Sequence, residues 1–174
     1  FVSGQTGPGV LVLGYSERLV GGVSKVTGLL LGSMPEMSLH PVLFSYHSFA
    51  RTAGETIISL LRYSAKLLFS RKYRLVLVII GSPPDAVRAL PFLGLARMLG
   101  RKSGIQFHTS TYAVIEGLRK DYLKGLVTRS WARTDFLCFL SSSLVEQYED
   151  ICDDDVEKMV VPNMIDNRWK NVQP

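Results

Sequence analysis

One histidine stands where a ligand could be bound. His108 ends the short apolar segment GIQFH at 104–108, and three hydroxyl residues, Thr109, Ser110 and Thr111, follow it directly. An imidazole beside hydroxyl groups can hydrogen-bond a sugar or take part in proton transfer. We therefore treat His108 as a candidate substrate-binding and catalytic residue, with a purely structural histidine as the alternative interpretation.

A glycine-rich segment, GYSERLVGG at 14–22, follows the first apolar run and precedes a helical pattern. Gly21 and Gly22 would let the backbone approach a ligand closely, and the free N–H groups at a helix start favour an anion. The spacing differs from the GxGxxG dinucleotide fingerprint, and no GKS or GKT ending makes the segment a P-loop. We expect Gly21 and Gly22 to bind substrate, and a glycine turn without a ligand is the alternative.

Other catalytic and metal-binding patterns are absent from the sequence. There is no GxSxG, no HExxH and no pair of suitably spaced carboxylates, and the acidic run at 153–155 has no ligand-spaced partners. The two cysteines, Cys138 and Cys152, form no CxxC pair, and Cys138 is expected to be buried within the apolar run 136–140. We therefore expect no metal and no other cofactor.

Alternating strand and helix patterns surround these candidate residues. Apolar runs typical of buried parallel strands occur at 10–15, 41–46, 74–80, 105–108, 136–140 and 157–161. Helical spacing occurs at 23–31, 55–70, 86–99 and 114–134. Ser143 and Glu146 have the spacing of a capping box at the start of one more helix. Pro91 is expected to kink or restart its helix, and Gly100 to end it.

The helices are long enough to connect parallel strands. The sequence therefore predicts an α/β fold: a Rossmann-like, doubly wound, mainly parallel sheet of about six strands with helices on both faces. In such sheets ligands bind beyond the carboxyl ends of the strands, near the point where the strand order reverses. Gly21, Gly22 and His108 all follow predicted strands.

Charge is unevenly distributed along the chain. The net charge of +5 combines residues 51–133, with 15 Lys or Arg and four acids, and residues 135–157, with eight acids and no Lys or Arg. Arg62, Lys66, Arg71 and Lys72 lie on or just after one predicted helix and could contact an anionic surface such as a membrane. Solvated helix faces are the alternative. No recognition-helix, RNP-like or zinc-finger pattern is present, so nucleic acid is not an expected partner.

The order of four segments resembles the N-terminal half of family 4 (glycogen-synthase-like, GT-B) glycosyltransferases. These segments are the strand with its Gly-Gly loop, the strand that ends in His108, the run FLCFLS at 136–141, and VVPNMID at 160–166. The last usually has the form V-x-P-N-G-V-D in that family, so Met164 and Ile165 depart from the pattern. The departure affects the turn after the last strand and not the candidate site. The resemblance covers residues 10–166.

The resemblance implies a role for each half of such an enzyme. The N-terminal half would mainly bind the acceptor, with Gly21 and Gly22 near the donor phosphate and His108 near the transferred sugar. A C-terminal half would hold the nucleotide through an Arg/Lys pair and a Glu-x7-Glu motif. The implied activity is a retaining, metal-independent transfer from a nucleotide-sugar to a carbohydrate or lipid-linked acceptor.

These observations predict three segments: a leader or cloning remnant at 1–9, the acceptor-side domain at 10–166, and the start of a linker to a donor-binding domain at 167–174. Alone, the chain is expected to be inactive. One alternative function is a non-catalytic module that docks a partner or an anionic membrane; another is half of a GT-B-type nucleotide-sugar epimerase. The expected location is the cytoplasm, with peripheral contact to the inner face of the membrane as a variant.

Overall fold

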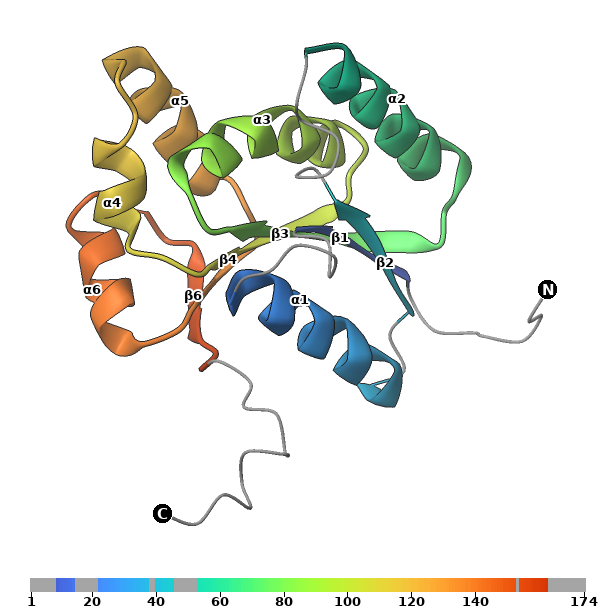
Figure 1. Ribbon diagram of the computed structural model, residues 1–174, viewed down its shortest axis with the longest axis horizontal. Helices are drawn as coiled ribbons and strands as arrows, with labels where there is room; N and C mark the ends of the chain where they lie inside the picture. Colours follow the sequence, from blue (N-terminus) through green and yellow to red (C-terminus); the bar gives the residue numbers. More distant parts are fainter. Residues whose placement is uncertain (1–8, 15–21, 38–39, 46–52, 153, 163–174) are drawn as a thin grey trace.

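A computed structural model describes residues 9–14, 22–37, 40–45, 53–152 and 154–162 (Figure 1). Strands and helices alternate along the chain, as the sequence predicts. Their order is β1 (Gly9–Gly14), α1 (Gly22–Ser33), the 3-10 helix η1 (Met34–Met37), β2 (His40–Ser45), α2 (Ala53–Phe69), β3 (Tyr73–Ile80), α3 (Pro83–Met98), β4 (Lys102–Phe107), α4 (Thr111–Glu116), α5 (Asp121–Trp131), β5 (Phe136–Phe139), α6 (Ser142–Glu149) and β6 (Glu157–Val160).

The six strands form one sheet in the order β2-β1-β3-β4-β5-β6, and every neighbouring pair is parallel. This confirms the predicted α/β, Rossmann-like fold. β2 lies on one side of β1, and β3 to β6 lie in order on its other side. The strand order therefore reverses between β1 and β3. Ligands of doubly wound sheets bind near such a point, at the carboxyl ends of the strands.

Side chains alternate between the two faces of the sheet because successive residues of a strand point in opposite directions. On one face Val10, Val12, Leu77 and Ile79 pack with the side chains of α1 and η1. On the other face the intervening residues of β1 and β3 form a larger core with the helices α2, α3, α5 and α6. Figure 1 shows α1 below the sheet and α2 and α3 above it.

An aromatic cluster anchors the later half of the sheet. Phe107 of β4 stacks on Phe139 of β5, with ring centroids 5.1 Å apart, and meets Trp131 of α5 edge to face at 4.9 Å. Tyr148 of α6 closes the cluster, and all four residues are buried. Because Phe107 immediately precedes His108, the cluster holds the chain rigidly just before the candidate site.

Two helices differ from expectation. The helical pattern at 114–134 forms α4 and α5 instead of one helix: α4 ends at Glu116, with Gly117 as its C-cap, and α5 begins at Asp121. The helix predicted at 86–99 begins at Pro83 and continues through Pro91 without restarting. Gly100, with φ of 63°, ends α3 as predicted: the amides of Gly100 and Arg101 bond to the carbonyls of Arg97 and Ala96.

Within the described ranges, no helix is both long enough and apolar enough to cross a membrane.

Candidate functional site

The carboxyl ends of the strands bring together three short segments from distant parts of the sequence. These segments are 81–85 after β3, 108–111 after β4 and 141–143 after β5, and we refer to them together as the carboxyl edge. Ile80 pairs with Phe107, so the first two segments leave the sheet side by side. Figure 1 shows that α1 begins near the same end of the strands as the connection from β4 to α4.

His108 extends the sheet by one residue and then turns into this edge. Its backbone amide donates to the carbonyl of Ile80 at 2.8 Å, which fixes the position of its Cα. The residue is half-buried, and its Nε2 atom is inaccessible to solvent and has no hydrogen-bond partner among the described residues. A buried polar atom without a partner is unfavourable. A ligand could reach this nitrogen only if the groups that cover it moved.

Burial also sets the charge of His108. Desolvation lowers the pKa of its imidazole from 6.5 to about 4, because a charged ring is disfavoured away from water. The ring is therefore neutral at pH 7. One of its nitrogens can then donate a hydrogen bond, and the other can accept one. Such a ring suits hydrogen bonding to an uncharged hydroxyl better than proton donation.

The three hydroxyls after His108 have separate roles. Ser110 caps α4 by accepting from the amide of Ala113 at 3.4 Å, and its hydroxyl donates to Oε1 of Gln147 on α6 at 2.7 Å. Thr111 is buried, and its Oγ1 has no partner within the described part of the chain. Thr109 is half-buried. Of the three, Ser110 is thus tied into the scaffold, and Gln147 is a neighbour that sequence spacing did not indicate.

The two glycines of the candidate site differ in what can be described. Gly22 is the first residue of α1, at the helix end where backbone N–H groups are unsatisfied. Gly21 lies outside the described residues. At Gly14, the end of β1, a methyl group would lie 3.1 Å from Cδ1 of Ile79 on β3, which is a tight contact, and 3.4 Å from Cγ2 of Thr27 on α1, which is an ordinary one.

A buried carboxylate organises the turn after β3. Asp85 is fully buried; it accepts hydrogen bonds from the hydroxyl of Ser82 at 2.6 Å and the amide of Gly81 at 3.3 Å, and lies 3.7 Å from Arg88. Pro83 and Pro84 remove two N–H groups from the start of α3, so that helix start is poorly suited to binding an anion. The sequence pattern at 81–85 predicts a turn that leads into a helix, and the hydrogen bond between Ser82 and Asp85 is a detail that this pattern did not indicate.

The segment after β5 corrects one expectation. Ser141, not Ser143, is the N-cap of α6, and the two serine hydroxyls lie 2.9 Å apart. The predicted capping box of Ser143 with Glu146 is therefore wrong. The strand ends one residue earlier than expected, and Ser141 adopts the extended backbone of a cap.

The four cations predicted to meet an anionic surface lie elsewhere. Arg62 and Lys66 are exposed on α2, and Arg71 and Lys72 are exposed in the turn between α2 and β3. Lys72 immediately precedes β3, whereas His108 follows β4. Because the two strands are parallel, Lys72 and His108 lie at opposite ends of the strands.

The described residues offer no other reactive constellation. Among them, no group of three or more His, Cys, Asp or Glu could hold a metal ion. Cys138 is buried as predicted, and desolvation raises the pKa of its thiol to about 11, so it is not a thiolate at neutral pH. Cys152 is also buried and free.

No protein-family model matches the chain, and no curated protein matches it either. Function is therefore inferred from the carboxyl edge itself.

Proposed function

We propose that residues 10–166 are the acceptor-side half of a retaining glycosyltransferase. The enzyme would transfer a sugar from a nucleotide-sugar to a carbohydrate or lipid-linked acceptor. The observation that carries the proposal is His108: a half-buried, neutral imidazole whose backbone is held by the sheet at the carboxyl edge. The order of the sequence segments supports the same activity.

Each candidate residue has a task matched to its surroundings. The imidazole of His108 binds a hydroxyl of the transferred sugar, which is uncharged and can both donate and accept. The start of α1, at Gly22, faces the donor phosphate, whose negative charge is favoured at the positive end of a helix. The donor nucleotide is held mainly by a second domain. The reaction exchanges the phosphate oxygen on the anomeric carbon for an acceptor oxygen, and no metal takes part.

The electrostatics of the edge favour sugar binding over acid–base chemistry by this half. A histidine with a pKa of about 4 is almost entirely neutral at pH 7, so it lacks the imidazolium form that would serve as a general acid. The carboxylate of the β3–α3 turn, Asp85, is buried and already accepts two hydrogen bonds. We therefore assign His108 a binding role and no proton-transfer role.

The proposed reaction is tested with the protein at its full natural length and with the 174-residue chain alone. Each is incubated with a panel of radiolabelled nucleotide-sugars, with and without candidate acceptors, and the products are separated. We expect acceptor-dependent transfer with retained anomeric configuration by the full-length protein, and none by the chain alone. Transfer by the chain alone would contradict the division into two halves. Conversion of one nucleotide-sugar into another without an acceptor would instead identify an epimerase.

A further inference from the structure

Helix α2 exposes apolar side chains on the side that faces away from the protein. Its inner side is already packed: Tyr63 and Leu67 are buried, and the hydroxyl of Tyr63 donates to the carbonyl of Phe92 on α3 at 3.1 Å. Five other apolar side chains of this helix are half or more exposed, and Phe69 is 88% exposed. They are Ile57, Ile58, Leu61, Leu68 and Phe69. A helix that is apolar on two sides is usually covered on both.

The other exposed apolar residues of the described chain are dispersed. Met98, Tyr112, Tyr122, Leu126 and Val160 lie on α3, α4, α5 and β6, and single residues of this kind are ordinary on protein surfaces. The five on α2 fall within about one third of the helix circumference, at 100° per residue. They form one continuous stripe, which we call the α2 stripe.

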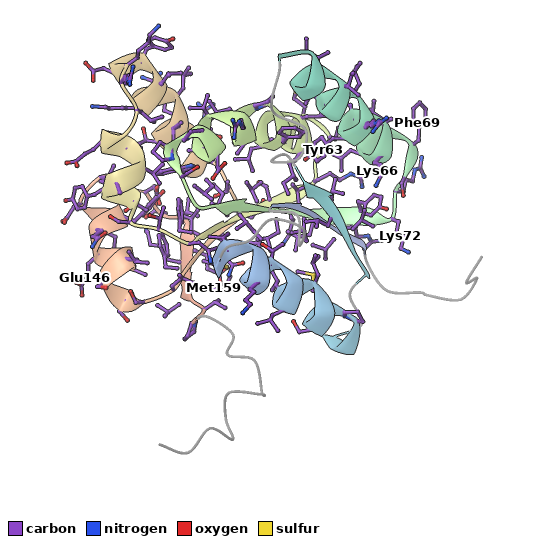
Figure 2. The ribbon with its side chains drawn as sticks, in the orientation of Figure 1. Tyr63, Lys66, Phe69, Lys72, Glu146 and Met159 are labelled. Carbon is purple, nitrogen blue, oxygen red and sulfur yellow. The ribbon has the colours of Figure 1, made fainter. Side chains whose placement is uncertain are left out.

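Cations border the α2 stripe, and Glu55 near the start of the helix is the one acid in the α2 sequence. Arg62 and Lys66 lie along one side of the stripe, and Arg71 and Lys72 follow the end of the helix. No Asp or Glu occurs in the sequence between Glu55 and Asp85. Figure 2 shows Lys66, Phe69 and Lys72 at the end of α2 that leads into β3, far from Glu146 on α6.

We propose that the α2 stripe docks the protein on an anionic lipid bilayer. Aliphatic and aromatic side chains beside lysine and arginine are the combination that binds such a surface: the apolar groups enter the headgroup region and the cations bind lipid phosphates. The positive charge beside the stripe favours anionic lipid over a second copy of the chain as the partner, because two copies of this surface would repel each other. The inference is independent of the proposed glycosyl transfer.

The location of the α2 stripe has a consequence for the molecule. Phe69 and Lys72 lie at the amino ends of the strands, whereas His108 lies at the carboxyl edge. The Phe69 end of the α2 stripe therefore lies away from the candidate site.

Co-sedimentation with vesicles tests the proposal. The 174-residue chain is mixed with vesicles of phosphatidylcholine alone or with phosphatidylglycerol added. We expect binding to the anionic vesicles only. This binding should weaken as salt is raised, because salt screens the attraction between the cations and the lipid phosphates. The double variant Leu68→Ser/Phe69→Ser should bind about tenfold more weakly. Its matched control, Met98→Ser on α3, removes an equally exposed apolar side chain and should bind as the parent does.

Charge is tested separately from apolar contact. Replacing Arg62, Lys66, Arg71 and Lys72 by Gln should weaken binding by about tenfold or more. The same change at Lys25, Arg119, Lys120 and Arg129, four exposed cations elsewhere, removes equal charge and should have a much smaller effect. All variants are at exposed positions, and circular dichroism checks that they are folded.

Three outcomes would overturn the proposal. The first is no binding to anionic vesicles at low salt. The second is equal loss of binding in both charge variants together with no effect of Leu68→Ser/Phe69→Ser, which would mean unspecific attraction. The third is a dimer in sedimentation velocity that Leu68→Ser/Phe69→Ser dissociates, with no vesicle binding, which would make a second copy the occupant.

Discussion

At the scale of single residues, burial gives His108 its chemistry. A histidine in water is partly charged near neutral pH, but His108 has its pKa lowered to about 4 by desolvation. The backbone of His108 is held by the hydrogen bond from its amide to the carbonyl of Ile80, and the residue before it, Phe107, is anchored in the aromatic cluster. His108 is therefore a fixed, neutral hydrogen-bonding group, which suits recognition of a sugar hydroxyl.

The pH dependence of stability should report this burial. Between pH 6.5 and about 4 the unfolded chain protonates His108 while the folded chain keeps it neutral. The unfolded state then binds more protons, so the contribution of His108 to stability falls as the pH falls through this range. Urea unfolding of the parent and of His108→Gln should show the parent losing about 2 kcal/mol relative to the variant, a value reduced because the ring is only partly buried. Parallel pH curves would contradict the lowered pKa.

At the scale of elements, the sheet depends on close approaches that only glycine permits. A methyl group at Gly104 of β4 would overlap the ring of Phe136 on the neighbouring strand β5. Phe136 packs against the α1 side of the core, so this ring cannot turn away without losing contacts.

Gly104→Ala should therefore destabilise the protein by about 1–3 kcal/mol in urea unfolding, because Phe136 must be displaced. Gly125→Ala is the matched control: it is in α5, has open space around it, and should stabilise by up to about 1 kcal/mol through helix propensity. Adding Phe136→Ala should remove most of the effect of Gly104→Ala, since the two changes share one contact. Fully additive effects of the two changes would show that the overlap is not the cause.

Most elements could be predicted from the sequence, because strands and helices have periodicities set by local geometry. The run at 74–80 is nearly the whole of β3, and Gly100 ends α3 through its positive φ. The break between α4 and α5 could not be predicted by periodicity, because the apolar spacing continues through 114–134. The close packing of Pro83 on Gly117, where a methyl group would overlap the proline ring, joins distant parts of the sequence and has no local pattern.

The candidate site was only partly predictable. The position of His108 after a strand indicated the edge where it lies, but its neutral state, and the absence of a partner for Nε2 among the described residues, arise from tertiary burial. The bond from Ser110 to Gln147 joins residues 37 positions apart, which no local pattern indicates. The apolar spacing of α2 predicted a helix, but it could not say that Leu68 and Phe69 face outward.

At the scale of the whole molecule, the two ends of the sheet carry different surfaces. The carboxyl edge holds His108 and the start of α1, and the amino ends of the strands lie beside the exposed end of α2 with its cations. A bilayer at one end and a sugar at the other can be engaged at the same time. If the acceptor is a lipid-linked sugar, docking through the α2 stripe would hold the protein on the membrane that contains its acceptor.

The most direct measurement of the central claim is the kcat/KM for sugar transfer by the full-length protein with His108 replaced. His108→Leu removes both nitrogens that can form hydrogen bonds. It should lower kcat/KM by about a hundredfold, since the proposed polar contact to the transferred sugar is lost. His108→Asn keeps a donor and an acceptor and should retain more of the rate. Unchanged kcat/KM in a correctly folded His108→Leu variant would contradict the account.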